Sequence, residues 1–379
     1  MSSKKLKIGI IAAEHSGDRL GANLIKALKN LDEVEVEVEV EVFGLGGPEV
    51  TSLGISTPNG MKYQDLQVMG LVDPLLKLPK LLSIRKKLTA LFLNQKIDIF
   101  IGVDSPDFNM YFHKKLNGLG IKTIQVVSPS VWGWRENRIK AISSYIDLTM
   151  CLFQFEHDYY LNKEMNSFFL GHPFSQLKSS VSRDVLEKYK LNGSQEFICI
   201  LPGSRKSEIL HMMPIFIKAA ERIFASNPNT FFLIPAASDE LKALIQNTLD
   251  QTSLNYQLTS STAKDYLSIS KIAIVTSGTA SLEAAVLGSL PIICYKTNPF
   301  NYAVLSRMIK TPFIGLPNLL LQKPLFPELV QHELTPEAIV HHYQNLSLDP
   351  LQFQSQLEQM NATMHGEGFE KAARLLLSL

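Results

Sequence analysis

The sequence has few cysteines and few tryptophans, and it has no long apolar run. Its 379 residues include three cysteines and two tryptophans. Cys151, Cys199 and Cys294 each lie in an apolar, strand-like segment without CxxC spacing, which argues against a disulfide framework and against a metal cluster. No apolar stretch approaches the ~18 residues that span a bilayer. The first five residues contain no signal-peptide core, so we expect a reduced, soluble, cytoplasmic chain.

Excess charge and the common cofactor signatures are absent as well. The formal net charge is +1, from 37 basic and 36 acidic residues, so a nucleic-acid partner is not indicated. A dinucleotide site would need GxGxxG after the first expected strand, and the segment 12–18 lacks it, which argues against an NAD or FAD enzyme. The histidines form no HxxxH pair, and Asp104 and Asp107 do not form an Asp-x-Asp pair. We therefore predict no metal ion and no cofactor.

Expected strands and helices alternate along the whole chain. Short apolar runs of strand length recur, and helical patterns such as 20–31 lie between them. Alternation of this kind predicts an α/β fold with parallel, doubly wound sheets. The expected strands are Ile8–Ala12, Ile97–Val103, Thr123–Val127, Leu148–Phe153, Ser167–Leu170, Phe197–Leu201, Phe231–Pro235, Ile272–Val275 and Leu290–Tyr295.

The expected strands fall into two series, which predicts two Rossmann-like domains. The polar segment 173–183 lacks strong periodicity and is the expected join. We place the N-terminal domain at 1–178 and the C-terminal domain at 179–351. A helical segment at about 352–379 is expected to pack back on the first domain, by analogy with other two-domain folds.

Residues 33–42 alternate strictly between glutamate and valine. A period of two fits a strand with valines on one face and glutamates on the other. Because the five like charges on one face repel, we expect part of this strand to project beyond its sheet or to be disordered.

Two polar loops follow strands of the N-terminal series, at the edge where open α/β sheets bind ligands. The first contains Glu14, Ser16 and Gly17, a richer set than a helix cap needs, although a plain N-cap is the alternative. The second begins with Asp104, whose carboxylate could act as a general base. An Asx turn before the following proline is the alternative for this residue.

A third loop, 127–135, contains both tryptophans of the chain. Trp132, Trp134 and Arg135 together suit stacking on a sugar or contact with an acyl chain. A corner of the hydrophobic core is the alternative interpretation.

Two loops of the C-terminal series are typical of anion sites. Each follows an expected strand and leads directly into a helix, whose first N–H groups and dipole attract an anion. One contains Ser204 and Arg205, and a guanidinium can bind phosphate oxygens in a bidentate manner. Ordinary helix caps are the alternative for both loops, but two such loops in one half-chain fit a diphosphate better. The other loop contains Ser277, Gly278, Thr279 and Ala280, followed about one turn later by Glu283.

The segment 68–92 is basic and amphipathic. Met69, Leu78 and Leu82 are among its apolar positions, and Arg85 is among its basic ones. Such a combination can lie on an anionic membrane surface. A packed helix with a solvated basic face is an equally common alternative.

Taken together, these motifs resemble the lipid-A-disaccharide synthase family of glycosyltransferases over nearly the whole chain. Ala13 and Gly133 stand where the family usually has glycine and alanine, and neither change removes a functional side chain. The motifs are AEHSGD (13–18), VMGLVD (68–73), VDSPDFN (103–109), VSPSVWGWR (127–135), GHP (171–173), LPGSRKSEI (201–209), TSGTASLE (276–283), PNLL (317–320) and PELVQHELTPE (327–337).

The resemblance implies a GT-B fold, in which the parallel sheets of two Rossmann-like domains face a central cleft. It also implies metal-free transfer from UDP-2,3-diacylglucosamine to 2,3-diacylglucosamine 1-phosphate, giving lipid A disaccharide 1-phosphate and UDP. Both substrates are acylated, which favours peripheral association with the cytoplasmic face of the inner membrane.

The resemblance also suggests roles for single residues in the N-terminal half. Asp104 is the expected base for the acceptor 6-hydroxyl, with Glu14 as its substitute. Ser16 is expected to contact the diphosphate side of the donor.

In the C-terminal half, Arg205 and the amides around 277–280 would stabilise the departing UDP. Glu283 would hold the ribose, and Asn318 would contact the diphosphate side.

Two other functions remain open from the sequence. A UDP-N-acetylglucosamine 2-epimerase-like enzyme also needs a diphosphate loop and a carboxylate for ribose, but it needs no lipid-facing surface. A non-catalytic peripheral membrane module would need neither Asp104 nor Arg205, so the presence of both argues against it.

Overall fold

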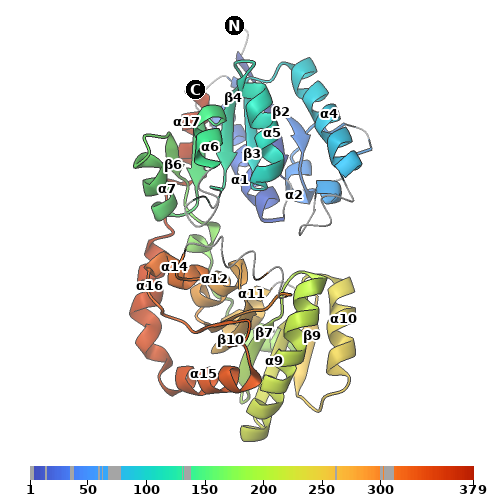
Figure 1. Ribbon diagram of the computed structural model, residues 1–379, viewed down its shortest axis with the longest axis vertical. Helices are drawn as coiled ribbons and strands as arrows, with labels where there is room; N and C mark the ends of the chain where they lie inside the picture. The colour runs from blue at the N-terminus through green and yellow to red at the C-terminus, as the bar shows by residue number, and fades with distance from the viewer. Residues whose placement is uncertain are drawn as a thin grey trace. The chain divides into compact units, whose positions relative to one another are not determined.

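The computed structural model of this chain describes residues 4–12, 15–34, 38–58, 60–61, 63–66, 78–129, 131, 138–260, 263–298, 302 and 311–379. It divides into two compact units (Figure 1). Unit 1 comprises Met1–His172 and His365–Leu379, and unit 2 comprises Pro173–Met364. Each unit contains one parallel sheet of six strands, which confirms the predicted α/β fold with two parallel sheets.

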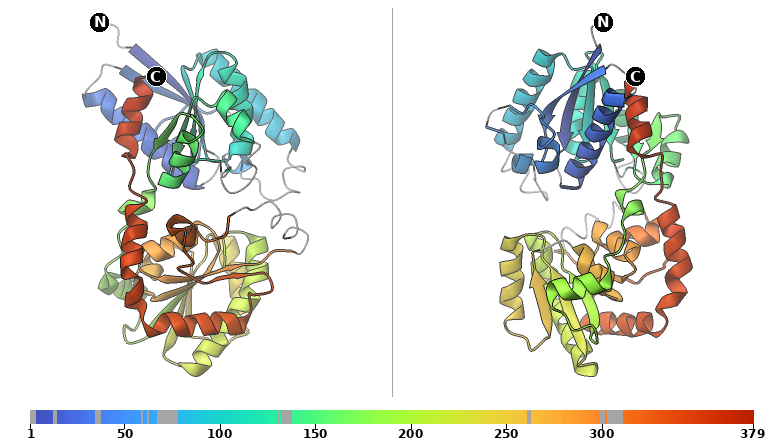
Figure 2. Two further views of the ribbon diagram at one scale, coloured as in Figure 1. Left: turned by 60° about the vertical axis from the view of Figure 1, so that its left-hand side comes forward. Right: turned by 180° about the vertical axis from the view of Figure 1, so that it is seen from behind.

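Unit 1 is built on a sheet with strand order β2-β1-β3-β4-β5-β6. Helices α1 and α17 cover one face of this sheet, and α4 and α5 cover the other (Figure 2). The strands are β1 (Lys4–Ala12), β2 (Val38–Leu45), β3 (Ile99–Val103), β4 (Lys122–Val126), β5 (Leu148–Cys151) and β6 (Ser167–Phe169). The helices are α1 (His15–Val34), α2 (Pro48–Thr51), η1 (Tyr63–Leu66), α4 (Leu78–Gln95), α5 (Pro106–Asn117), α6 (Ile139–Tyr145), α7 (Gln154–Leu161) and α17 (Gly368–Leu377).

Unit 2 repeats this plan with strand order β12-β11-β10-β7-β8-β9. Its strands are β7 (Glu196–Leu201), β8 (Thr230–Pro235), β9 (Tyr256–Thr259), β10 (Ile272–Thr276), β11 (Leu290–Tyr295) and β12 (Glu328–Val330). Its helices are η3 (Pro173–Gln176), α8 (Ser182–Tyr189), α9 (Lys206–Ser226), α10 (Asp239–Leu249), α11 (Ala263–Ile269), α12 (Thr279–Val286), α14 (Leu316–Leu321), α15 (Pro336–Leu348), η4 (Pro350–Phe353) and α16 (Gln354–Ala362).

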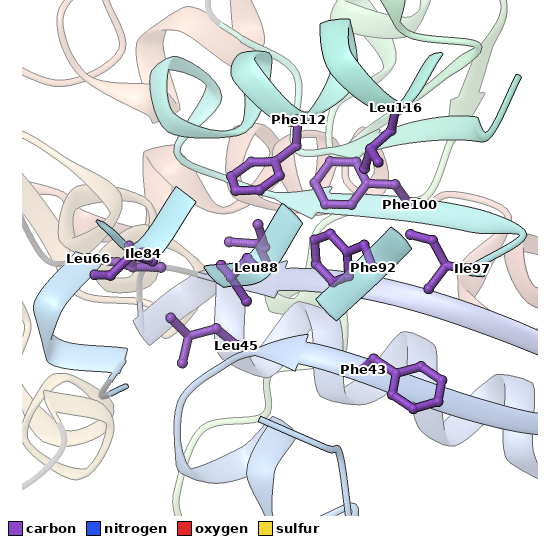
Figure 3. Close-up of a cluster of buried hydrophobic side chains, with 11 residues drawn as sticks. Phe43, Leu45, Leu66, Ile84, Leu88, Phe92, Ile97, Phe100, Phe112 and Leu116 are labelled. Atoms are coloured by element: carbon purple, nitrogen blue, oxygen red, sulfur yellow. The ribbon is translucent and has the colours of Figure 1, made fainter. Parts of the chain in front are cut away.

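A hydrophobic core fills the space between the sheet of unit 1 and helices α4 and α5 (Figure 3). The rings of Phe92, Phe100 and Phe112 form its centre, with centroid separations of 5.7, 5.9 and 5.6 Å. Phe92 also packs against Gly9 of β1, where a Cβ atom would come within 3.0 Å of the ring. The missing side chain at Gly9 therefore lets α4 pack closely on the sheet.

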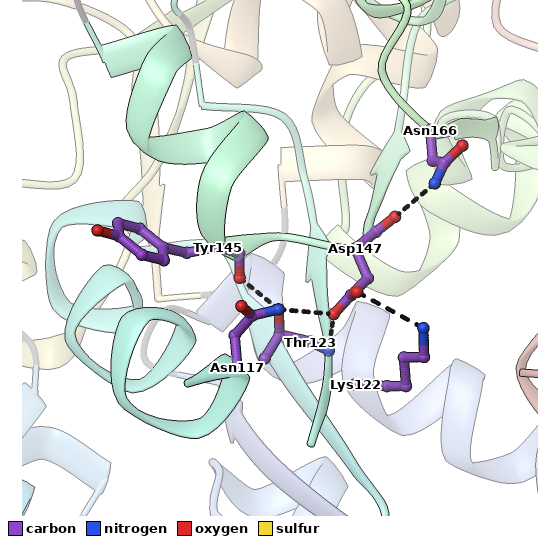
Figure 4. Close-up of polar contacts among 6 residues, drawn as sticks. All are labelled: Asn117, Lys122, Thr123, Tyr145, Asp147 and Asn166. Atoms are coloured by element: carbon purple, nitrogen blue, oxygen red, sulfur yellow. Dashed lines mark hydrogen bonds and ion pairs between the residues drawn. The ribbon is translucent and has the colours of Figure 1, made fainter. Parts of the chain in front are cut away.

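The amino ends of β4, β5 and β6 are tied together by Asp147 (Figure 4). Its carboxylate accepts hydrogen bonds from the backbone N–H of Thr123 at 2.8 Å and from Asn117 Nδ2 at 3.2 Å. The Nζ atom of Lys122 lies 3.7 Å from the same carboxylate. The backbone oxygen of Asp147 accepts a hydrogen bond from Asn166 Nδ2 at 3.1 Å. The cluster therefore joins three neighbouring strands at the amino edge of the sheet.

The strand predicted from the Glu-Val run is present in its second half. In β2, Val40 and Val42 are buried, whereas Glu39 and Glu41 form ion pairs with Lys5 of β1 at 2.8 and 2.9 Å. The two carboxylates raise the pKa of Lys5. The cation of the neighbouring strand thus offsets the repulsion between the glutamates.

The first residues of the run behave differently. Glu33 and Val34 belong to α1, which is longer at both ends than the predicted 20–31. Residues 35–37 lie outside the described residues.

Two short edge strands of unit 2, β9 and β12, are not predicted by the sequence. β9 is only partly buried and β12 has three residues, so neither contains a clear apolar run. The C-terminal helices are divided between the units, since α16 contacts α14 whereas α17 contacts α1. Within the described ranges, every helix is too short or too polar to cross a bilayer.

We expect Phe92→Ala to lower the free energy of unfolding by about 3–5 kcal/mol, because it removes a fully buried ring from the centre of the core. Thermal or urea unfolding measures the change. The matched control is Leu93→Ala, the next residue of the same helix, whose side chain is 40% exposed. Equal losses for the two variants would contradict the packing described for α4.

Candidate functional site

Each sheet has one point at which the strand order reverses, so that later strands are added on the other side of the first strand. In unit 1, β1 pairs with β3, and the chain adds β2 on one side and β4 to β6 on the other. In unit 2, β7 pairs with β10 in the same way. Open α/β sheets bind ligands at the carboxyl ends of strands at such a point. The loops after β1, β3, β7 and β10 are therefore the candidate sites, and they carry most of the residues predicted above.

Asp104 is the first residue after β3, and its side chain is partly buried. Its Oδ1 accepts a hydrogen bond from the Ser105 N–H at 2.8 Å, and its Oδ2 accepts one from the Ser16 hydroxyl at 3.5 Å. Burial raises the pKa of the Asp104 carboxyl, while the bonds from Ser105 and Ser16 act in the opposite direction. A carboxylate desolvated in this way binds a proton more strongly than an exposed one.

The backbone around Asp104 is strained. Asp104, Ser105 and Val127 have φ angles of 53°, 39° and 72°. Residues other than glycine rarely adopt positive φ, and a β-branched valine does so least readily. Each such residue costs on the order of 1–3 kcal/mol, so the conformation persists only where surrounding contacts impose it. Here the carbonyl oxygen of Asp104 accepts hydrogen bonds from Asn109 Nδ2 at 2.8 Å and Gln125 Nε2 at 3.1 Å.

The start of α1 lies close to Asp104 because Gly17 has no side chain. A Cβ atom on Gly17 would lie 3.3 Å from Asp104 Cβ. Ser16 is exposed beside the carboxylate. The fully buried Asp18 accepts hydrogen bonds from two backbone N–H groups at the start of α2, so it anchors that helix. Glu14, the substitute base, lies outside the described residues.

The predicted aromatic contacts Trp132 and Trp134 lie outside the described residues, as does Arg135. Of the neighbouring residues, Val131 is buried in a small cluster between α6 and α7. Arg138 forms an ion pair with a carboxylate at the start of α5.

The loop after β7 turns at Gly203, where φ is 114° and a Cβ atom would collide with Glu208. The carboxylate of Glu208 accepts a hydrogen bond from the Ser204 N–H at 3.0 Å and lies 3.3 Å from the Arg205 guanidinium. The Arg205 side chain remains 51% exposed. Burial raises the pKa of Tyr295 at the end of β11; the charge of Glu208 acts in the same direction and that of Arg205 in the opposite one.

The loop after β10 leads directly into α12, with Gly278 as its N-cap at a φ of 153°. This sharp turn brings the first N–H groups of α12 to the carboxyl edge of the sheet. Burial and the charge of Glu283 both raise the pKa of the Cys199 thiol in β7. Gly278 and Thr279 are exposed, whereas Ser277, Ala280 and Glu283 are partly buried.

Asn318 and Glu328 belong to a hydrogen-bond network that reaches this loop at Ser277. Asn318 is 1% exposed, and its amide bonds to both backbone groups of Phe326 and to the Glu328 carboxylate, each at 2.8 Å. The same carboxylate accepts the N–H groups of Ile314 and the next residue at 2.8 and 3.0 Å. The Ser277 hydroxyl in turn donates to the Ile314 carbonyl at 2.9 Å. The structure thus places Asn318 in a buried scaffold that positions the loop.

Helix α4 uses its apolar stripe mainly for the core of unit 1. Leu82 is 52% exposed and lies on the outer face with Lys86, whereas Arg85 packs against α5. The Arg85 guanidinium lies 5.1 and 5.0 Å from the ring centroids of Phe108 and Tyr111, and burial lowers its pKa. Leu78 is the first residue of α4, and Met69 lies outside the described residues.

The sequence alone does not single out Gln125, His113 or Glu328. Gln125 is a polar residue inside an apolar strand, which was the only signal available for it. Glu328 and Asn109 fall within recognisable motifs but have no predicted role there. Among the described residues, no cluster of His, Cys, Asp and Glu is arranged to hold a metal ion.

Comparison with known proteins identifies the relatives of this chain. Residues 8–375 match the family described as Lipid-A-disaccharide synthetase. The lipid-A-disaccharide synthase of Saccharophagus degradans is 38% identical over 96% of this chain and 92% of its own length. Lipid-A-disaccharide synthase 2 of Legionella pneumophila strain Lens is 33% identical over 100% of this chain and 98% of its own length.

Solved structures share the fold at much lower identity. The glycotransferase of kitacinnamycin is 13% identical with a TM-score of 0.62, and the alignment covers 98% of both chains. A UDP-GlcNAc 2-epimerase from Neisseria meningitidis, bound to UDP-GlcNAc, is 14% identical with a TM-score of 0.58, covering 99% of this chain and 98% of its own. The epimerase likeness therefore concerns the fold, whereas the synthase likeness extends to the sequence. The chain belongs to the lipid-A-disaccharide synthase family, glycosyltransferases of lipid A biosynthesis.

Proposed function

We propose that this chain joins UDP-2,3-diacylglucosamine to 2,3-diacylglucosamine 1-phosphate, giving lipid A disaccharide 1-phosphate and UDP. Asp104 takes the proton from the acceptor 6-hydroxyl, and that oxygen attacks the anomeric carbon of the donor. The bond from this carbon to the diphosphate breaks with inversion, and UDP leaves. The observation that carries the proposal is the partly buried, strained Asp104 at the turning point of the first sheet.

The environment of Asp104 suits a general base. Desolvation raises the pKa of its carboxyl above the ordinary value, which moves it towards the pH at which proton transfer is most efficient. The neighbouring Ser16 hydroxyl is exposed, and we propose that Ser16 and Gly17 border the bound substrate. We retain Glu14 as a substitute base because it lies two positions before Ser16 in the same sequence motif.

The donor site of the proposal lies at the loops after β7 and β10. Arg205 is exposed and would neutralise the departing diphosphate together with the N–H groups of 277–280. Glu283 lies on α12, about one turn after this loop, is partly buried and would accept hydrogen bonds from the ribose. Because the amide of Asn318 is engaged with Phe326 and Glu328, we propose that it holds the loop rather than touching phosphate.

The acyl chains of both substrates suggest a membrane-facing surface. On α4, Leu82 and Leu93 are 52% and 40% exposed, and Lys86 and Lys87 are exposed nearby. Exposed leucines beside lysines suit an anionic lipid surface. We propose that this outer face of α4 contacts the membrane, with Trp132 and Met69 as further contacts.

Mass spectrometry of the product from defined acylated donor and acceptor tests the overall reaction. The expected product is the disaccharide 1-phosphate, formed together with UDP. An epimerase would instead convert UDP-N-acetylglucosamine without any acceptor, and that outcome would replace the proposal.

We expect Asp104→Asn to lower kcat by at least about 100-fold, because the amide cannot accept the proton. Calorimetric UDP affinity should stay unchanged, since the UDP loops lie in unit 2. The control is Asp158→Asn, an exposed carboxylate on α7 of the same unit. Near-normal turnover of Asp104→Asn would remove this residue from the base role.

The same carboxylate should set the acidic limb of the kcat–pH profile. Only the deprotonated form accepts a proton, so turnover falls as pH drops through the Asp104 pKa. Because burial raises this pKa, the limb should lie above the range of an ordinary exposed aspartate.

We expect Arg205→Ala to weaken UDP binding about 10- to 100-fold, the loss typical of a charged hydrogen bond of about 1.5–3 kcal/mol. Isothermal calorimetry with UDP measures it. Arg183→Ala is the matched control, because Arg183 is also exposed in unit 2 and forms its ion pair with Glu187 of its own helix. Equal affinities of the two variants would place the diphosphate elsewhere.

We expect Leu82→Asp to reduce binding to phosphatidylglycerol vesicles about 10-fold or more, because burying a leucine contributes about 1.5–3 kcal/mol. Sedimentation with vesicles measures the bound fraction. Leu161→Asp changes a leucine of similar exposure, 51%, on α7 and should leave binding intact. Unaltered binding of Leu82→Asp would exclude this face of α4.

A further inference from the structure

A group of buried polar side chains lies directly behind Asp104. Asn109 and His113 are one turn apart on α5, and Gln125 lies in β4. All three side chains are fully buried. They fit against β3 because Gly102 has no Cβ, which would come within 2.9–3.0 Å of His113 and Asn109. Polar groups buried together at this density call for a specific role, because apolar side chains could fill the same space at lower cost.

The hydrogen bonds of Gln125 define its orientation. Its Nε2 donates to the backbone oxygens of Asp104, Val126 and Val127 at 3.1, 3.0 and 3.3 Å. Its Oε1 lies 2.9 Å from His113 Nε2. The reversed amide would direct an oxygen at these carbonyls, so only this orientation is stable.

His113 holds the amide in this orientation. Since Gln125 Oε1 can only accept, His113 must donate from a protonated Nε2. Burial lowers the pKa of His113 to about 4, so the ring is neutral around pH 7. A neutral ring with its proton on Nε2 matches the need of Gln125 without placing a charge in the core.

These contacts converge on the strained backbone. The Asp104 carbonyl receives donors from Asn109 on the helix side and from Gln125 on the strand side. Gln125 also donates to the carbonyl of Val127, another residue with a positive φ angle. One amide therefore bonds to two of the three strained residues, Asp104 and Val127, across neighbouring strands.

We infer that Gln125, oriented by His113 and assisted by Asn109, is a positioning residue that directs the Asp104 carboxylate towards the acceptor hydroxyl. The inference rests on the proposed role of Asp104 as base. Without the Gln125 donor, the Asp104 carbonyl loses its strand-side hydrogen bond while the Asn109 bond remains, so the peptide after Asp104 leaves its left-handed conformation more readily and the carboxylate turns with it. A displacement of about 1 Å at a reacting group is enough to cost about 100-fold in rate.

The test is Gln125→Leu, which keeps the volume and removes the donors. We expect kcat to fall about 100-fold while the donor KM and the UDP affinity stay unchanged. Combined with Asp104→Asn, it should cause no further loss, because the two changes affect one function. Asn109→Ala removes the second donor and should lower kcat about 10-fold with the fold retained.

Ile124→Val is the matched control. Ile124 is the adjacent buried residue of β4, with its side chain on the opposite face, so it should shift the melting temperature and leave kcat intact. A melting shift without a kcat loss in both Gln125→Leu and Asn109→Ala would overturn the inference while leaving Asp104 as the base. If Asp104→Asn itself turns over normally, the proposed base role fails first, and the two failures are thereby distinguished.

Discussion

The pairing of two parallel strands at the turning point of each sheet is the constraint on which both candidate sites depend. Parallel pairing brings the carboxyl ends of β1 and β3 to one edge in unit 1, and those of β7 and β10 to one edge in unit 2. Residues that are remote in the chain therefore meet. Ser16 and Asp104, 88 positions apart, lie within 3.5 Å because the strands before them are hydrogen-bonded neighbours.

The two edges use polar groups in different ways. In unit 1 a carboxylate is partly desolvated and held on a strained backbone, an arrangement suited to proton transfer. In unit 2 the edge presents an exposed guanidinium and the start of a helix, an arrangement suited to an anion. Each edge also has a polar scaffold. Gln125 bonds to the backbone of Asp104, and Glu328 bonds to Ile314, which in turn bonds to Ser277. The hydrogen bonds of these scaffolds are directional and therefore orient the loops, whereas a purely apolar core could not do so.

Much of the fold could be predicted from the sequence, because buried parallel strands are short apolar runs separated by helical patterns. The predictions were wrong where local pattern and tertiary packing disagree. Glu33 and Val34 continue α1 although they begin a strand-like repeat, and the edge strands β9 and β12 are too polar or too short to stand out. Asn318 illustrates a further limit. Its motif suggested a phosphate contact, yet only the packing of α14 against the 326–328 segment determines where its amide points.

The sequence by itself determined the two strand–helix series, the loops that follow them and the family to which those loops belong, since these depend on periodicity and on neighbouring residues. Only the tertiary structure decided which side chains meet at each loop. It placed Gln125 and His113 behind Asp104, raised the pKa of that carboxyl by burial and turned Arg85 towards α5. The physical reason is that burial and hydrogen-bond partners are set by strand neighbours and helix faces that are distant in the chain, so no local window of sequence contains them.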